Sequence, residues 1–214
     1  MCSVRFSLPW LSVLHSGRAT HNYAFHQTRK NGAPVKAALG IREKAVLKCE
    51  MTGRSYADVS DGIWDNGEFI SWDWINGQLH RQERQKEFPG ANAELIEVFD
   101  ELVETAIIYK EVTGRFLPIF GELGEIYAEL RYCLKRNRAC APGSDGRIGN
   151  DHVEVKTISP QKRKHKIQLK RSGNFNKVIV VRISADFEFE SRMFERRRLS
   201  KGSGKFAKIS WASI

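Results

Sequence analysis

This 214-residue sequence lacks any apolar run of the roughly 20 residues that a membrane-spanning helix needs. We therefore expect a soluble protein with no membrane partner. The sequence also lacks the cysteine pairs of a zinc site or a disulfide framework, because Cys2, Cys49, Cys133 and Cys140 form no Cys-x-x-Cys pair and have no suitably spaced histidines. We interpret the four cysteines as ordinary thiols, which favours a reducing, cytoplasmic location.

Acidic residues are absent from residues 1–42, which contain six Lys or Arg. Apolar residues there have no sustained period, and prolines and glycines interrupt every candidate element. A transit peptide, or a signal core at Phe6 to Leu14, fits less well, because Pro9 interrupts that core and no small-residue cleavage site follows it. We predict that residues 1–50 form a disordered extension. An alternative is that translation begins at Met51, where the composition changes.

The net charge of +10 is divided unevenly along the chain. Residues 43–130 hold 8 basic and 18 acidic residues, whereas residues 131–214 hold 21 basic and 7 acidic residues. Lysines and arginines supply a sequence-independent attraction to phosphates. The second half therefore has the charge of a domain that binds a polyanion.

We predict an acidic helical subdomain over residues 51–114. Residues 56–74 combine acids with tryptophans around an Asp-Asn-Gly turn at 65–67. The nearby acids would repel a phosphate backbone, so we favour core packing or a protein contact for these tryptophans over base stacking. Helices are expected from a Ser71 cap to about Gln85 and from about Asn92 to Thr113, with Gly114 as a stop. Their roles are packing, contact with another protein, or self-association as a homodimer.

A third helix is predicted over residues 119–135, with apolar residues at 120, 123, 127, 130 and 134 on one buried face. Small residues at 121, 124 and 128 lie beside that face and would let the helix approach a sheet closely. Glu125 is the next position round from this strip, with Glu122 and Glu129 nearer to solvent. Glu125 is thus the acid best placed to reach the sheet; the alternative is that all three glutamates are solvated.

The stretch Gly143–Thr157 places Asp145 before a turn and Glu154 and Lys156 on the strand that follows. Residues two apart on a strand share a face, so Glu154 and Lys156 project together while Val153 and Val155 point into a core. Two carboxylates beside a lysine form a plausible Mg²⁺ site, with the lysine available for a phosphate or a water.

The order of a helix-borne Glu125, then Asp145, then Glu154-Val155-Lys156 resembles the PD-(D/E)XK nuclease superfamily over about residues 115–185. Gly143 and Ser144, not a proline, precede the aspartate. The resemblance implies an α/β fold with a restriction-endonuclease-like mixed β-sheet flanked by helices, in a core over residues 115–214.

The resemblance also implies an activity and a set of roles. Asp145, Glu154 and the Val155 carbonyl would bind Mg²⁺ or Mn²⁺, and Lys156 would orient a water or stabilise charge on the phosphate. Glu125 would hold a metal-bound water or a second ion. The implied function is that of a metal-dependent DNA endonuclease of restriction or mobile-element defence type.

After this strand, alternation predicts a half-buried strand with a basic outer face over residues 162–171. It is either a solvated edge kept soluble by lysines or a phosphate-binding surface, and its position after the Glu-x-Lys strand favours the second. The candidate DNA-binding residues are Lys162, Arg163, Lys164, Lys166, Gln168, Lys170 and Arg171.

The remaining segments carry weaker signals. Residues 177–183 predict a buried central strand. The basic C-terminal tail, rich in Arg and Lys from residue 196 to 208, would clamp DNA or remain mobile. We interpret His152 as a hydrogen-bonding or surface residue and Asp151 as a turn residue that could compete with Asp145 as a ligand. Besides a nuclease, the sequence is compatible with an inactive DNA-binding module of nuclease-like fold or with a protein-binding adaptor.

Overall fold

The computed structural model describes residues 46–138 and 143–214. They form two compact units, residues 46–83 and residues 84–214. The chain mixes α-helices with β-sheets, including a five-stranded mixed sheet, which confirms the predicted α/β class. Within the described ranges, no helix combines the length and the apolar character that crossing a membrane requires.

Two short antiparallel pairs and the beginning of a helix make up unit 46–83. β1 (Leu47–Lys48) pairs with β2 (Ser55–Tyr56), and β3 (Gly62–Asp65) pairs with β4 (Glu68–Ser71). Asn66 and Gly67 form the β3–β4 turn with φ values of 48° and 87°, the backbone that tight hairpin turns favour, so the predicted turn is confirmed. α1 (Trp72–Glu87) follows β4 directly, as the Ser71 cap predicts, and its last turn belongs to unit 84–214.

Trp64 and Trp72 of unit 46–83 are exposed, whereas Trp74 is half-buried. Trp64 is 58% exposed on the hairpin and packs edge-on against Phe69, and Trp72 is 43% exposed and donates its indole N–H to the Ser60 carbonyl. Core packing was one of the two favoured interpretations for these residues. The exposure of Trp64 and Trp72 leaves contact with another protein as a proposal for these two residues.

Cys49 is the buried centre of this unit. Its thiol accepts hydrogen bonds from Ser71 N at 3.5 Å and from Ser71 Oγ at 3.4 Å. Burial opposes the thiolate, but hydrogen bonds from Ser71 and Thr52 outweigh it and lower the pKa of Cys49 from 9.0 to about 6. The positions Cys49, Thr52, Ser71 and Trp74 also have the Cys-x₂-Cys-x₁₈-Cys-x₂-Cys spacing of four-cysteine zinc sites, with one cysteine present.

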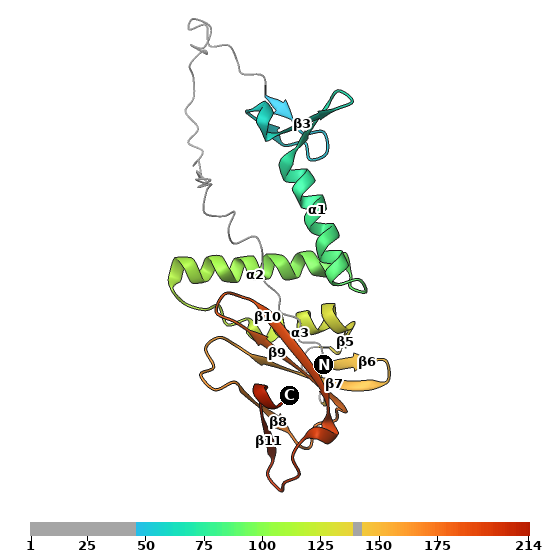
Figure 1. The fold of residues 1–214 in the computed structure, drawn as a ribbon, viewed down its shortest axis with the longest axis vertical. Helices are drawn as coiled ribbons and strands as arrows, with labels where there is room; N and C mark the ends of the chain where they lie inside the picture. Colours follow the sequence, from blue (N-terminus) through green and yellow to red (C-terminus); the bar gives the residue numbers. More distant parts are fainter. Residues whose placement is uncertain (1–45, 139–142) are drawn as a thin grey trace, which may run out of the picture. The chain divides into compact units, whose positions relative to one another are not determined.

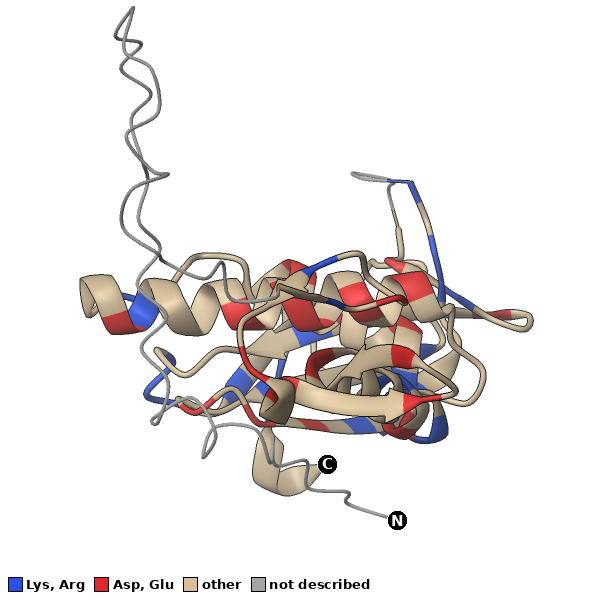
Figure 2. Ribbon diagram, turned by 90° about the horizontal axis from the view of Figure 1, so that it is seen from above, with Lys and Arg blue, Asp and Glu red and all other residues tan. Residues whose placement is uncertain are grey.

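Two helices cover one face of the main sheet in unit 84–214. α2 (Ala93–Thr113) begins after Asn92, whose side chain accepts from Glu94 N, and ends at Gly114, which has a left-handed backbone. α3 (Phe120–Tyr132) follows. The predicted apolar face of α3 is buried, because Leu123, Tyr127 and Leu130 are at most 4% exposed. Asp and Glu positions recur along the helices (Figure 2).

The main sheet has the strand order β10-β9-β7-β6-β5, with β7 parallel to β9 and the other pairs antiparallel. Its strands are β5 (Lys135–Arg136), β6 (Gly146–Ile148), β7 (Asp151–Ile158), β9 (Lys177–Ile183) and β10 (Phe189–Glu195). In β9, Ile179 and Val181 pack toward the helices, while Val178 and Val180 pack toward the other face. The prediction of a buried central strand is confirmed.

A small second sheet covers the other face (Figure 1). β8 (Lys166–Lys170) pairs with β11 (Phe206–Ser210), and Ile167, Leu169 and Trp211 pack with Ile158, Val178 and Val180 of the main sheet. The half-buried character predicted for β8 is confirmed, because Ile167 and Leu169 alternate with exposed Lys166, Gln168 and Lys170.

Three predicted boundaries differ from the structure. α2 packs in the same core as α3 and the sheet, so the chain divides between residues 83 and 84 and not at 114. Residues 47–50 are structured, because β1 pairs with β2 and Cys49 is buried; the rest of the predicted extension, residues 1–45, lies outside the described residues. The C-terminal tail is folded, since residues 206–210 form β11.

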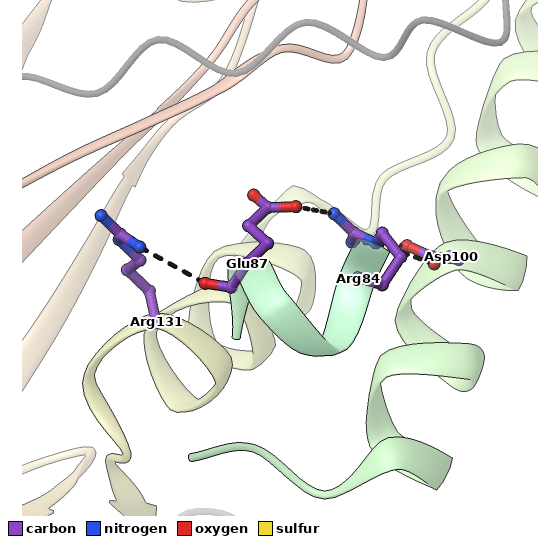
Figure 3. A network of polar contacts seen from close by, with 4 residues as sticks. All are labelled: Arg84, Glu87, Asp100 and Arg131. Carbon is purple, nitrogen blue, oxygen red and sulfur yellow. Dashed lines mark hydrogen bonds and ion pairs between the residues drawn. The ribbon is translucent and has the colours of Figure 1, made fainter. Parts of the chain in front are cut away.

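Arg84 joins the last turn of α1 to α2 (Figure 3). Its guanidinium, which is buried, donates from Nε and Nη2 to the two carboxylate oxygens of Asp100 at 3.0 and 2.6 Å, and from Nη1 to Glu87 at 2.5 Å. Arg131 Nη1 donates to the Glu87 carbonyl at 3.5 Å, which links α3 to the same network. Burial raises the pKa of the Glu87 carboxyl despite the nearby Arg84 charge.

Candidate active site

The candidate site lies along β7. Val153 and Val155 are buried in the core beneath the helices, so Glu154 and Lys156, which alternate with them, lie on the opposite face of the sheet. Lys156 Nζ is 2.6 Å from Glu154 Oε1, and these side chains are 33% and 17% exposed. Alternation along the strand therefore places the two residues together, as the sequence predicts.

Asp145 joins this pair because β6 ends early. The β6–β7 ladder stops at the pair Gly146 and Val153. Beyond it, the Val155 N–H donates to the Asp145 carboxylate, at 2.6 Å from Oδ2, where a longer β6 would have supplied a backbone carbonyl. Within one strand residue the N–H and C=O point to the same side. The Val155 carbonyl therefore also faces the edge of β7 that β6 leaves open.

The segment before Asp145 is held by hydrogen bonds. Asn137 donates from Nδ2 to the Ser144 carbonyl at 2.9 Å, and the buried Ser144 hydroxyl lies 3.3 Å from His152 Nδ1. Asp145 N donates to the Val153 carbonyl at 3.0 Å. These bonds fix where the Asp145 carboxylate lies, and they give His152 the hydrogen-bonding role that its sequence context favours.

Two oxygens of the candidate site already converge on one positive charge. The Lys156 ammonium pairs with Glu154 Oε1 and also donates to the Val155 carbonyl at 3.1 Å. Both oxygens belong to the predicted metal-ligand set. Asp145, the third member, is fixed through Oδ2 to the N–H of Val155, and its Oδ1 makes no hydrogen bond within the described residues.

This donor set fits a hard divalent cation, because Mg²⁺ and Mn²⁺ favour carboxylate and carbonyl oxygens and Mg²⁺ keeps several waters. The set has two carboxylates and one carbonyl. Among the described residues, no group of three or more His, Cys, Asp or Glu side chains is arranged to hold a metal.

Close packing brings α3 to the sheet beside Glu125. A methyl group on Gly124 would lie 2.0 Å from Thr157 Oγ1 on β7, so only glycine fits at this approach. Glu122 and Glu129 both pair with Arg136, at 2.6 Å each. Glu125 forms no hydrogen bond or ion pair in the described part of the chain, and its side chain remains available.

The pKa of the Glu125 carboxyl is raised from its usual 4.5. Burial is the main cause, and the negative charges of Asp145 and Glu122 add to it, while Arg136 and Lys156 oppose it. The charges of Asp145 and Lys156 thus act on Glu125, although α3 covers the face of the sheet opposite to Glu154 and Lys156. A pKa that is shifted by burial together with specific neighbouring charges is typical of functional sites, although structural ion-pair networks also shift pKa values.

Asp151, the competing ligand in the sequence, is engaged elsewhere. Asn176 Nδ2 donates to its Oδ1 at 2.7 Å, and Lys177 Nζ lies 2.5 Å from its Oδ2. Both partners stand at the start of β9. Asp151 therefore connects the first residues of β7 and β9.

The predicted DNA-binding residues are spread over β8 and its flanking turns. Lys166, Gln168 and Lys170 lie on the outer face of β8, away from the main sheet, because Ile167 and Leu169 occupy the inner face. The structure therefore does not bring Gln168 to Glu154. Lys162 donates to the Thr157 carbonyl at 2.8 Å, and Arg163 and Lys164 are exposed in the preceding turn. Arg171 lines a cleft beside β9.

Sequence reasoning missed Arg136, which forms ion pairs with both Glu122 and Glu129. Glu122 and Glu129 are seven residues apart and share a helix face, so a cation after the helix could have been sought as their partner.

No protein-family model matches the chain, and no curated protein matches it either.

Proposed function

We propose that this protein is a metal-dependent nuclease that hydrolyses DNA phosphodiesters, with a restriction-endonuclease-like arrangement of unit 84–214. The proposal rests on two observations at the open edge of β7: Lys156 contacts both Glu154 and the Val155 carbonyl, and Asp145 accepts a hydrogen bond from the Val155 N–H. The basic second half supports a polyanionic substrate.

In this proposal Asp145, Glu154 and the Val155 carbonyl hold Mg²⁺ or Mn²⁺, which supplies Lewis acidity toward the phosphate and the attacking water. The fixed hydrogen bond from Val155 N orients the Asp145 carboxylate before substrate arrives. Preorganised groups of this kind stabilise developing charge with little reorganisation.

Lys156 provides the positive charge that stabilises negative charge building on the scissile phosphate. Glu125, with its raised pKa and no other partner, orients the attacking water and accepts its proton. A carboxylate of raised pKa is a stronger base than an ordinary one. Removal of Glu125 should therefore slow hydrolysis more than it weakens DNA binding.

The test incubates the full chain with supercoiled plasmid, single-stranded DNA and branched DNA, with Mg²⁺ or Mn²⁺. We expect cleavage by the wild type and its loss in Glu154→Gln and Lys156→Met. Glu190→Gln is the matched control, because Glu190 lies in the same sheet and pairs with Arg182, outside the site. Equal cleavage by wild type and Glu154→Gln would contradict the proposed site, and inertness of the wild type on every substrate would contradict the nuclease function.

A second candidate is a DNA-binding module that retains this arrangement without cleavage. The uneven charge favours it independently of the site. It would be identified by salt-dependent DNA binding that is unchanged in Glu154→Gln, together with no hydrolysis by any variant.

A further inference from the structure

A basic cleft lies at the start of β9 and the end of β10, separate from the candidate active site. It has a volume of about 890 Å³. Phe175 and Leu199 form apolar parts of its wall, and the basic residues that line it are Arg171, Lys177, Arg196, Arg197 and Lys201. Its full lining includes five basic residues and two acidic ones, Asp151 and Glu195. The cleft therefore favours an anionic ligand.

Three of its five cations are already engaged. Lys177 pairs with Asp151, and Arg197 pairs with Glu195. The Arg196 guanidinium donates to the Gly173 and Phe175 carbonyls and lies 4.9 Å over the Phe175 ring. Arg196 thus supports the wall of the cleft.

Arg171 and Lys201 have no acidic partner within the described residues. Arg171 Nη1 is anchored to the Ser200 carbonyl at 2.5 Å, and its backbone N–H donates to the Lys205 carbonyl. Its Nε is the one buried side-chain nitrogen or oxygen without a hydrogen-bond partner among the described residues. Because Nε is enclosed by the protein, the guanidinium would donate to a phosphate oxygen through its terminal nitrogens.

We infer that this cleft binds a phosphodiester of a nucleic-acid backbone through Arg171 and Lys201, beside the phosphate that the active site cleaves. Phe175 and Leu199 of the cleft pack with Val178 and Val180, on the face of the main sheet that also carries Glu154. Along β7, Asp151 at the cleft and Glu154 are three residues apart, which is about 10 Å. One bound strand spans both. The choice of nucleic acid as ligand rests on the proposed function, but the cleft contacts the backbone without any metal.

The test measures binding of a labelled random-sequence DNA duplex to the full-length Glu154→Gln protein, without divalent metal, from 50 to 200 mM salt. Arg171→Lys keeps the charge and removes the guanidinium fork, and Lys201→Gln removes an exposed charge. Lys86→Gln, an exposed lysine on α1, is the control for the loss of one charge. Unfolding curves for each variant show whether the fold is retained.

We expect Lys201→Gln to weaken binding several-fold, uniformly across sequences, and to reduce the slope of log K against log salt by about 1. Arg171→Lys should also weaken binding, while Lys86→Gln should leave it unchanged. If the folded cleft variants bind as the control does, the inference is overturned, even where the wild type cleaves DNA. Loss of binding in the cleft variants with no cleavage by any protein would retain the cleft and contradict the nuclease function.

Inorganic phosphate is the second probe. Titration of the wild type and of Arg171→Lys by calorimetry separates a small-anion site from a backbone site. One result would overturn the assignment to a nucleic-acid backbone: inorganic phosphate binds the wild type but not Arg171→Lys, while both proteins bind the duplex equally well.

Discussion

Two glycines on α3 should respond differently to alanine. At Gly124 a methyl group would lie 2.0 Å from Thr157 Oγ1, 3.1 Å from its Cβ and 3.2 Å from its Cγ2. At Gly121, which is exposed, nothing lies within 4 Å of the added carbon. The two positions are three residues apart in one helix, so they differ mainly in this contact.

The magnitudes follow from two effects. Alanine in place of helical glycine stabilises by about 1 kcal/mol, and overpacking costs about 1–3 kcal/mol. Gly121→Ala should therefore stabilise unit 84–214 by about 1 kcal/mol. Gly124→Ala should be less stable than Gly121→Ala by about the 1–3 kcal/mol that overpacking costs. Thr157→Ala in the Gly124→Ala background should recover part of the loss, since it removes Oγ1 and Cγ2.

Amide hydrogen exchange over residues 177–183 is a suitable assay, because these residues form the buried β9 and exchange when the unit opens. Thermal unfolding followed by circular dichroism gives an independent value. Equal stabilisation by both alanine variants would refute the close approach of α3 to β7, and with it the position assigned to Glu125.

The remaining predictions concern Arg84 and Cys49. Arg84→Met should destabilise unit 84–214 by about 3 kcal/mol, because Glu87 and Asp100 lose their hydrogen bonds to the guanidinium. This value is at the low end for a buried pair because both carboxylates are partly exposed. Urea unfolding measures the change, and an unchanged stability would contradict the role of the network. Because the folded pKa of Cys49 is lowered to about 6, its contribution to stability should be complete above its unfolded pKa and be lost as pH falls through about 6. Tryptophan fluorescence during urea unfolding at pH 5.5 to 9 should show this dependence in the wild type and not in Cys49→Ser. Replacing Thr52, Ser71 and Trp74 with cysteine should create a zinc site with Cys49, detected by the visible absorption of bound Co²⁺; no Co²⁺–thiolate absorption would show that the spacing is coincidental.

Local signals in the sequence were enough to predict several elements. The Asn92 and Gly114 caps mark both ends of α2, and alternation in β7 places Glu154 and Lys156 on one face. Each of these features depends on residues close together in the chain. The same is true of the Asn66-Gly67 turn, because its backbone requirement is local.

Features that depend on distant residues could not be predicted in this way. The basic tail is folded because residues 206–210 pair with β8, about 40 residues earlier in the chain. This pairing, together with the apolar face of β8, turns Gln168 outward and away from Glu154. The pairing of Arg136 with two glutamates likewise appears only when β5 is placed beside α3.

Titration of Mn²⁺ followed by electron paramagnetic resonance tests the central claim most directly, because it reports on the site without requiring cleavage. The wild type should bind Mn²⁺ at the site, Glu154→Gln should lose that binding, and Glu190→Gln should keep it. Lys156→Met should bind Mn²⁺ more tightly than the wild type while failing to cleave DNA, because the Lys156 ammonium contacts two of the predicted ligand oxygens. Equal Mn²⁺ binding by the wild type and Glu154→Gln, or no binding by the wild type, would contradict a metal-dependent site at the edge of β7.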